Sequence, residues 1–382
     1  MSVKRRRLLF LTGTRADFGK LKPLLAAVSE VDGLDTFIFT TGMHVLKRYG
    51  STWEEVENAG LGKMYMFVNQ TPGDGMDAVL AKTISGLSDF VKENRPDLIV
   101  VHGDRTEALA GALVGCFNRV RVAHIEGGEL SGTVDETIRH TITKLSHAHF
   151  VSNAEASSRL LQMGELRSSI FVIGSPEVDI MSSPNLPSLE VVRTKYELPF
   201  TEYGVLIFHP VTTEIDSIED QAREVVDFVL ESDRNFLAIL PNNDYGSELV
   251  ERQFERLQAC NRVRLLPSMR FEYYLTALKN AQFMIGNSSS GIREAPFYGV
   301  PSINLGTRQF NRSRALSVVD ANCSRTEIAA AVDRALSQHV TPSQLYGDGR
   351  SGERFKEIVT SEVLWDVSVQ KAFVDRPIAA AN

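Results

Sequence analysis

Side chains able to move protons and hold anions are concentrated between His102 and His140. The chain reads HGDR there and, after an interval typical of a helix, HIEGGELSGTVDETIRH. Carboxylates and imidazoles are the usual general acids and bases of enzymes. Glycines lie directly beside them and let a ligand approach the backbone closely. A solvated face would also tolerate many charges, but it would not place them directly after buried strands. The stretch therefore predicts a functional site.

Two short apolar runs must position these groups, LIVV before His102 and VRVA before His124. Such runs are typical of buried parallel strands, and open parallel sheets bind ligands at the carboxyl ends of their strands. The predicted strand Leu8–Thr12 leads into GTRADFG in the same way, and we expect a helix from about Lys20. The turn lacks the GxGxxG and GxxxxGK(S/T) patterns, so neither a standard dinucleotide site nor a P-loop is supported.

The strongest anion-binding signal in the second half is GNSSSGIREAP, after the apolar run Phe283–Ile285. Ser288, Ser289 and Ser290 supply hydroxyls, and a helix beginning there would aim backbone N–H groups at a phosphate. A serine nucleophile is the rival interpretation, but the segment does not fit the GxSxG pattern. A plain serine-rich loop is the simplest alternative.

Four further residues of the second half are candidates. Arg308 suits charge-assisted contacts to phosphate, and Glu294 suits the hydroxyls of a sugar such as ribose. Asn242 suits neutral polar groups. His209 follows the predicted strand of the segment FHPVTTE and suits proton transfer near a leaving group.

His140, His147 and His149 resemble a metal cluster at first sight. The spacing is not HExxH, and no carboxylate falls at a diagnostic offset, so we predict no metal site. We interpret His147 and His149 as packing or hydrogen-bonded histidines. Thr133 and Glu136 have the spacing of a capping box, which gives Glu136 a structural explanation.

Composition bounds the class of protein. The chain has 382 residues, too many for one ordinary core. Its net charge of -7 argues against nucleic acid as a partner. The cysteines, Cys116, Cys260 and Cys323, are widely spaced and form no CxxC pair, which fits a reducing cytoplasm. No apolar run approaches the length of a membrane span, so we expect no membrane association.

Strand-like runs alternate with helix-like stretches in both halves of the chain. This alternation predicts an α/β fold of two Rossmann-like parallel-sheet domains facing each other across a cleft. We expect a first domain over 1–175, a proline-rich linker over 176–203 and a second domain over 204–355. Residues 356–382 should form a helical segment that packs back on the first domain.

Seven motifs occur together and in order: GTRADFGKL, TGMH, HGDR, HIEGGELSGTVDETIRH, FHPVTTE, GNSSSGIREAP and NLGTRQ. The ordered set resembles the hydrolysing UDP-N-acetylglucosamine 2-epimerases of bacterial sialic acid biosynthesis, over roughly Leu8 to Gly349. Each motif alone is weak. Non-hydrolysing relatives carry QTGQH and an AGLRTGD-type loop, whereas this chain has TTGMH and GGELSGTVD. The resemblance therefore favours the hydrolysing branch.

The resemblance implies a GT-B-like fold and the conversion of UDP-GlcNAc and water into N-acetylmannosamine and UDP. It implies passage through 2-acetamidoglucal with no cofactor. Asp104, Glu126 and Asp135 would handle protons, with His209 near the leaving group; which carboxylate takes the C2 proton stays open. By the same resemblance, the substrate-binding residues would be Arg15, His44, His102, Arg105, His124, Asn242, Ser288, Ser289, Ser290, Glu294 and Arg308.

The resemblance further implies a cytoplasmic homodimer or homotetramer. The nearest alternative is a sister epimerase acting on a UDP-2,4-diacetamido-2,4,6-trideoxyhexose of the legionaminic acid pathway. A GT-B glycosyltransferase is a more remote alternative, and a nucleotide-sugar sensor without activity is the least favoured.

Overall fold

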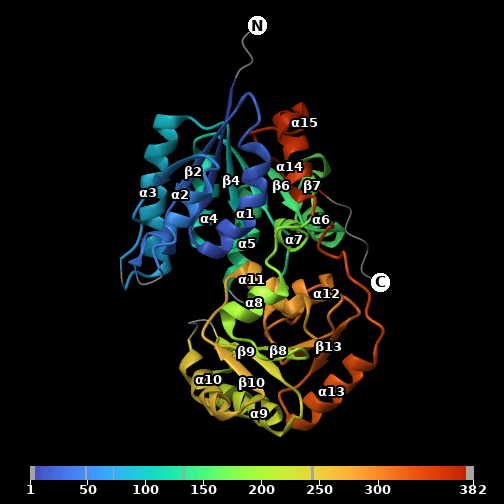
Figure 1. Cartoon of the computed structure of the whole chain (residues 1–382). Helices are drawn as coiled ribbons and strands as arrows, with labels where there is room; N and C mark the ends of the chain where they lie inside the picture. Colours follow the sequence, from blue (N-terminus) through green and yellow to red (C-terminus); the bar gives the residue numbers. More distant parts are fainter. Residues whose placement is uncertain (1–4, 48–49, 72, 132–133, 242–244, 376–382) are drawn as a thin grey trace. The chain divides into compact units, whose positions relative to one another are not determined.

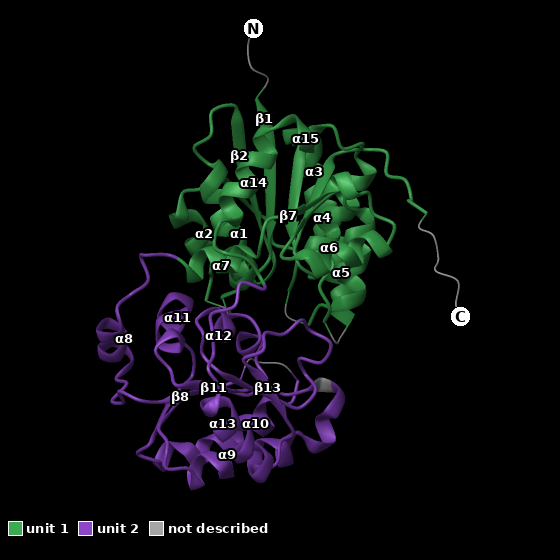
Figure 2. Cartoon of the chain, turned by 90° about the vertical axis from the view of Figure 1, so that its right-hand side faces the viewer, with its two compact units in different colours: residues 1–182, 346–382 green, residues 183–345 purple. Residues whose placement is uncertain are grey.

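The structure is a computed structural model that describes residues 5–47, 50–71, 73–131, 134–241 and 245–375 (Figure 1). The chain divides into two compact units (Figure 2). Unit 1 comprises Met1–Ser182 and Tyr346–Asn382, and unit 2 comprises Ser183–Leu345. The predicted domains were 1–175 and 204–355, with a linker over 176–203 and a returning segment over 356–382. Each unit holds one parallel α/β sheet of Rossmann type.

Unit 1 is built on a seven-stranded parallel sheet with the order β3-β2-β1-β4-β5-β6-β7 in the described residues. Its strands are β1 (Arg6–Thr12), β2 (Leu34–Thr40), β3 (Lys63–Met66), β4 (Leu98–His102), β5 (Arg121–Ile125), β6 (Ala148–Val151) and β7 (Ile170–Val172). The order reverses between β1 and β4. In open α/β sheets such a reversal opens a crevice at the carboxyl ends of the strands.

Alternate side chains of β1 enter two separate cores, because successive residues of a strand point to opposite faces. Leu8 and Phe10 pack with one helical layer that includes Phe355, whereas Leu9 and Leu11 pack with the other. The helices of unit 1 are α1 (Arg15–Val28), α2 (Trp53–Ala59), α3 (Met76–Asn94), α4 (Thr106–Phe117), α5 (Val134–Leu145), α6 (Ala154–Gln162), α7 (Pro176–Met181), α14 (Ser351–Thr360) and α15 (Glu362–Trp365).

Helix α1 begins earlier than the sequence analysis expected. It starts at Arg15 rather than near Lys20, because Thr14 and Asp17 form a capping box. The Thr14 hydroxyl accepts from Asp17 N at 3.2 Å, and the Asp17 carboxylate accepts from Thr14 N at 3.1 Å. The segment read as a turn therefore contains the first helical turn. The Arg15 side chain projects from the start of a helix.

Unit 2 is built on a six-stranded parallel sheet with the order β10-β9-β8-β11-β12-β13 in the described residues. Its strands are β8 (Gly204–Ile207), β9 (Phe236–Ile239), β10 (Val263–Leu266), β11 (Phe283–Gly286), β12 (Ser302–Leu305) and β13 (Val318–Ala321). The order reverses between β8 and β11. Gly286 closes β11 with a φ of +135°, where a Cβ would meet the backbone of Ile207 on β8.

The larger described core of unit 2 lies between its sheet and a layer that contains α9, α10 and α13. Leu206 and Phe208 of the first strand segment are buried in it completely. The helices of unit 2 are α8 (Leu189–Tyr196), α9 (Ile218–Glu231), α10 (Ser247–Phe254), α11 (Phe271–Lys279), α12 (Glu294–Phe297) and α13 (Arg325–Ser337). None of the described helices combines the length and apolar composition that a membrane span requires.

The segment 176–203, expected as a linker, contains α7 in unit 1 and α8 in unit 2. The chain returns to unit 1 at Tyr346, and α14 then joins the core of that unit. Phe355 of α14 packs edge-on against Phe10 and Phe150, with ring centroids 6.1 and 4.9 Å away. The end of the chain is thus a structural part of unit 1.

Candidate functional site

In unit 1, Arg139 joins the Asp104 side chain to the backbone of Glu126. It forms an ion pair with the Asp104 carboxylate through Nη2, and Nη1 donates to Glu126 O at 3.0 Å. Asp104 follows β4 and Glu126 follows β5, so one guanidinium bridges the carboxyl ends of adjacent strands. Arg139 itself is buried. We call Asp104, Glu126, Asp135 and Arg139 the carboxylate cluster.

Glu126 is buried and held from several sides. Its Oε2 lies 3.1 Å from His102 Nε2 and 3.4 Å from Lys20 Nζ. Its Oε1 accepts a hydrogen bond from the Ser175 hydroxyl. Buried carboxylates are tolerated when they are paired and hydrogen-bonded in this way. His102 is thereby placed beside a carboxylate, where an imidazole can exchange a proton.

The backbone of Glu126 is also unusual. Its φ is +60°, a left-handed conformation that costs a non-glycine residue roughly 1–3 kcal/mol. Glu126 N donates to Phe150 O at 2.9 Å, and Glu126 O accepts from Arg139, which together hold this conformation. Backbone strain of this kind clusters at functional sites.

Helix α5 carries the third carboxylate. Asp135, Arg139 and Thr143 are spaced by four residues and therefore share one face of the helix. Asp135 lies in the first turn and is half-buried. Glu136 accepts from Ser131 N at 2.9 Å, so it does stabilise the segment before the helix. Its predicted capping partner, Thr133, lies outside the described residues.

His44 and His124 are fully buried, and both ring nitrogens of each are engaged. His124 lies 2.8 Å from Gly103 O and 3.1 Å from the Thr143 hydroxyl. His44 lies 2.9 Å from the Thr12 hydroxyl and 2.8 Å from the Thr52 hydroxyl. Burial lowers the pKa of both imidazoles. These contacts hold the loops after β1, β2 and β4 in place, which suits positioning rather than contact with a ligand.

Two predicted arginines flank the strand reversal of unit 1. Arg15, after β1, is half-exposed with Nε 3.0 Å from Glu55 Oε2. Arg105, after β4, has Nε 3.6 Å from Glu107 Oε2. Glu107 was not among the predicted site residues; it is buried, and burial raises its pKa. A Cβ on Gly42 would lie 2.7 Å from Glu107 Oε1, so that glycine permits the packing.

In unit 2, Asn287 joins three loops that carry predicted site residues. Its Oδ1 accepts from His209 N at 2.7 Å, and its Nδ2 donates to His209 O at 2.8 Å. Its own carbonyl accepts from Arg308 Nη1 at 3.3 Å and from Gln309 Nε2 at 2.9 Å. The loops after β8, β11 and β12 are therefore tied together across the strand reversal. We call these contacts the Asn287 network.

The serine loop differs from the predicted helix start. Ser289–Gly291 forms a single 3-10 turn, and α12 comprises only four residues. The prediction that a regular helix begins at this loop is therefore wrong, and the helix start no longer supports an anion site there. The Ser288 hydroxyl accepts from Ser290 N at 3.3 Å, and the buried Ser290 hydroxyl bonds to Tyr274 Oη. Ser288 and Ser289 are half-buried and keep the predicted positions after β11.

Glu294 is buried on α12, near Tyr298. Burial, and then the charge of Glu294, raises the pKa of the Tyr298 phenol. A second loop contact joins Glu214, in the loop after β8, to the Thr307 hydroxyl after β12. Asn242 lies outside the described residues.

His147 and His149 hold neighbouring parts of unit 1 together. His149 Nε2 lies 3.0 Å from Glu165 Oε2, and Val122 N donates to His147 Nδ1 at 3.1 Å. Both side chains are buried. Across the described residues, no group of three or more His, Cys, Asp or Glu side chains could hold a metal ion.

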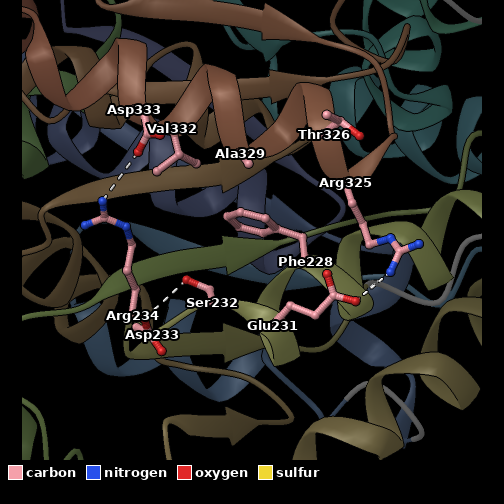
Figure 3. Close-up of a pocket in the computed structure, with 10 residues that line it drawn as sticks. All are labelled: Phe228, Glu231, Ser232, Asp233, Arg234, Arg325, Thr326, Ala329, Val332 and Asp333. Atoms are coloured by element: carbon pink, nitrogen blue, oxygen red, sulfur yellow. Dashed lines mark hydrogen bonds and ion pairs between the residues drawn. The ribbon is translucent and has the colours of Figure 1, made fainter.

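A hollow of about 620 Å³ lies between α9 and α13 of unit 2, away from these loops (Figure 3). Its arginines are engaged with acids: Arg325 with Glu231 at 2.5 Å, and Arg234 with Asp333 at 3.6 Å. None of the predicted site residues is among those lining it. The hollow therefore lacks the predicted acid–base and phosphate-binding residues.

Comparison with known proteins places the chain among nucleotide-sugar epimerases. The family profile described as UDP-N-acetylglucosamine 2-epimerase matches residues 26–360. A Neisseria meningitidis serogroup B protein named UDP-N-acetylglucosamine 2-epimerase is 48% identical over 97% of this chain and 99% of its own length. A Legionella pneumophila protein named UDP-N,N'-diacetylbacillosamine 2-epimerase (hydrolyzing) is 32% identical over 93% of this chain and 95% of its own.

Solved structures share the fold at low sequence identity. The Neisseria meningitidis UDP-GlcNAc 2-epimerase bound to UDP-GlcNAc has a TM-score of 0.80 at 17% identity, covering 93% of this chain and 99% of that one. The Methanocaldococcus jannaschii enzyme in complex with UDP-GlcNAc and UDP has a TM-score of 0.76 at 22% identity, with the same coverages. Their fold is GT-B-like. Profile, relatives and fold agree, and the chain belongs to the UDP-N-acetylglucosamine 2-epimerase family.

Proposed function

We propose that the chain is a hydrolysing UDP-GlcNAc 2-epimerase, which converts UDP-GlcNAc and water into N-acetylmannosamine and UDP for sialic acid biosynthesis. The relative with 48% identity is named for epimerisation of this sugar nucleotide. Relatives with 32% and 30% identity carry the word hydrolyzing in their names, and another with 32% identity is named for polysialic acid biosynthesis. These names support the hydrolysing branch and the pathway.

The observation that carries the proposal is the bridge that Arg139 makes between Asp104 and Glu126. The C2 proton of a sugar is weakly acidic, so its removal requires a fixed base. The ion pair fixes the Asp104 carboxylate, and the backbone hydrogen bond fixes the main chain at Glu126. The Glu126 carboxylate is itself held by His102, Lys20 and Ser175. His102 and Lys20 lie against Glu126 and supply a route for the proton.

In the proposed reaction, a carboxylate of the cluster removes the C2 proton while the bond from C1 to the UDP oxygen breaks. This elimination forms 2-acetamidoglucal. Water then adds its hydroxyl to C1, and C2 receives a proton on the opposite face, which inverts C2. Asp104, Glu126 and Asp135 are the proposed acid–base residues, and we leave the C2 base unassigned among them.

The Asn287 network supports the other requirement of the reaction, a stabilised leaving diphosphate. It fixes His209 and Arg308 next to the loop of Ser288 and Ser289. We assign these residues to UDP, with Glu294 on the ribose. An arginine and hydroxyl groups are suitable donors to phosphate oxygens.

Product analysis in heavy water tests the proposal. We expect purified protein to release UDP from UDP-GlcNAc and to give N-acetylmannosamine with solvent deuterium at C2. Product without deuterium at C2 would exclude the elimination. The Legionella relative favours one competitor, a UDP-2,4-diacetamido-2,4,6-trideoxyhexose substrate. If the protein releases UDP only from that sugar nucleotide, then that compound, and not UDP-GlcNAc, is the substrate.

A further inference from the structure

The C-terminal segment 366–374, here called the strap, crosses the C-terminal end of helix α5. The ammonium group of Lys371 donates to Thr143 O at 2.7 Å and to Ser146 O at 2.6 Å. Carbonyl groups at this end of a helix lack intrahelical donors and carry the negative end of the helix dipole. Lys371 thus caps α5 from a position more than two hundred residues away in sequence.

The same ammonium group lies 2.6 Å from Glu165 Oε2. Glu165 is buried and also contacts Lys144 Nζ at 2.8 Å and His149 Nε2 at 3.0 Å. Burial alone would raise the pKa of this carboxyl, but His149 and the two lysines outweigh it and lower the pKa to about 2. Burial lowers the pKa of Lys371 to about 8. The proposed reaction uses none of these groups.

Other contacts seat the strap against unit 1. Val374 N donates to Gly164 O at 3.2 Å, and Arg121 Nε donates to Val367 O at 3.1 Å. His147 Nε2 lies 3.2 Å from Val369 O. The strap is therefore attached at several points along its length, and Lys371 is its most deeply inserted charge.

Helix α5 connects the strap to the carboxylate cluster. Thr143, whose carbonyl accepts from Lys371, lies 3.1 Å from His124 through its hydroxyl. One turn earlier, Arg139 contacts Asp104 and Glu126, and one turn before that lies Asp135. A helix transmits a shift along its axis because its turns are hydrogen-bonded in series. Movement of its C-terminal end would therefore displace Arg139 and Asp135.

We propose that Lys371 and Glu165 are positioning residues that lock the C-terminal end of α5, so that the strap fixes the geometry of the carboxylate cluster. This inference rests on the proposed function for its kinetic readout. It also predicts a structural effect that does not depend on activity. UDP binding is assigned to unit 2 and should not depend on the contact between Lys371 and Glu165.

The test uses Lys371→Met in the full chain, with Lys356→Met as the matched control on the exposed face of α14. Lys371→Arg restores a cation, and the double variant Glu165→Gln/Lys371→Met avoids an uncompensated buried carboxylate. We expect Lys371→Met and the double variant to lower kcat about 10- to 100-fold, the cost of a small misplacement at a distance. The Kd for UDP should change less than about twofold, and Lys371→Arg should recover part of kcat.

Hydrogen exchange supplies the second readout. Amides of α5 should exchange faster in both Lys371→Met variants than in the Lys356→Met control, while amides of α1 should not change. Unchanged kcat and α5 exchange would overturn the inference. Equal losses of kcat and UDP affinity with faster exchange throughout would overturn it as well, since they indicate general destabilisation. If the wild-type chain releases no UDP, the proposed function fails. The inference about α5 can still be tested then, because hydrogen exchange does not depend on activity.

Discussion

The carboxylate cluster of unit 1 and the Asn287 network of unit 2 occupy equivalent places in their sheets but are built differently. Both lie at the carboxyl ends of parallel strands, the first after β4 and β5 and the second after β8, β11 and β12. In the first, Arg139 forms an ion pair with Asp104, and the Glu126 carboxylate lies beside Lys20 and His102. The second is held by a neutral amide that bonds to backbone groups of neighbouring loops. The arrangement in unit 1 therefore depends on charges, whereas the arrangement in unit 2 depends on the hydrogen bonds of one uncharged amide.

Removing a carboxylate is expected to give the largest effect. Asp104→Asn and Glu126→Gln keep the size of the side chain but remove its basicity. We expect kcat to fall by at least about a hundredfold, the low end for general acid–base groups, with UDP affinity retained. Steady-state kinetics and calorimetric titration with UDP measure the two quantities. Near-normal turnover in either variant would remove that residue from the proposed mechanism.

Removing the Asn287 amide of unit 2 should mainly weaken UDP binding rather than lower kcat. Asn287→Ala loses two hydrogen bonds to His209 and leaves buried groups unsatisfied, at a cost of about 1–3 kcal/mol. We expect UDP affinity to weaken about tenfold, with a smaller change in kcat. Asn304→Ala is the matched control, because Asn304 is also buried but bonds to Asp320 at 2.7 Å. Equal losses in both variants would mean that Asn287 acts only through stability.

The difference between the units should also appear in the pH dependence of stability. Burial lowers the pKa of His44, His124, His147 and His149, all in unit 1. The unfolded chain then binds protons below about pH 6.5 that the folded unit does not, so stability is present above that pH and is lost on acidification. Each histidine contributes up to about 1.4 kcal/mol per pH unit.

Tryptophan fluorescence can measure this effect, because Trp53 and Trp365 both belong to unit 1. Denaturant midpoints recorded between pH 7.5 and 5.5 should change little down to about pH 6.5 and decrease below it. In His124→Gln the midpoint should decrease less with falling pH, because one of the buried histidines no longer contributes. Midpoints that do not change with pH would contradict the buried neutral state of these imidazoles.

The smallest expected effect is at the serine loop. Ser289→Ala removes one half-buried hydroxyl, worth about 0.5–1.5 kcal/mol if it donates to a phosphate. We expect UDP affinity to fall a few-fold, with kcat nearly unchanged. Ser290→Ala is the useful contrast, since that hydroxyl already bonds to Tyr274. An unchanged UDP affinity in Ser289→Ala would remove the hydroxyl from the phosphate site.

Much of the fold could be predicted from local patterns. The runs LIVV and VRVA lie in β4 and at the start of β5, and the helix expected between them is α4. Strand β13 was not predicted, because Val319 is the one buried residue among its four. The start of α1 was misplaced because the capping box of Thr14 and Asp17 was overlooked. The serine loop was read as a helix start, but its hydroxyls satisfy contacts inside the loop and with Tyr274.

The sequence by itself determined which residue types follow each strand, since strand ends are marked by the change from apolar to polar residues. Tertiary structure alone decided which groups hold them. Arg139, Asn287 and Lys371 are separated in sequence from their partners, and nothing in local pattern indicates those pairings. The physical reason is that a buried charge or amide is satisfied by whichever groups the fold brings within about 3 Å. The residues from His102 to His140 supply the carboxylates, and helix α5, capped by a distant lysine, supports their arrangement.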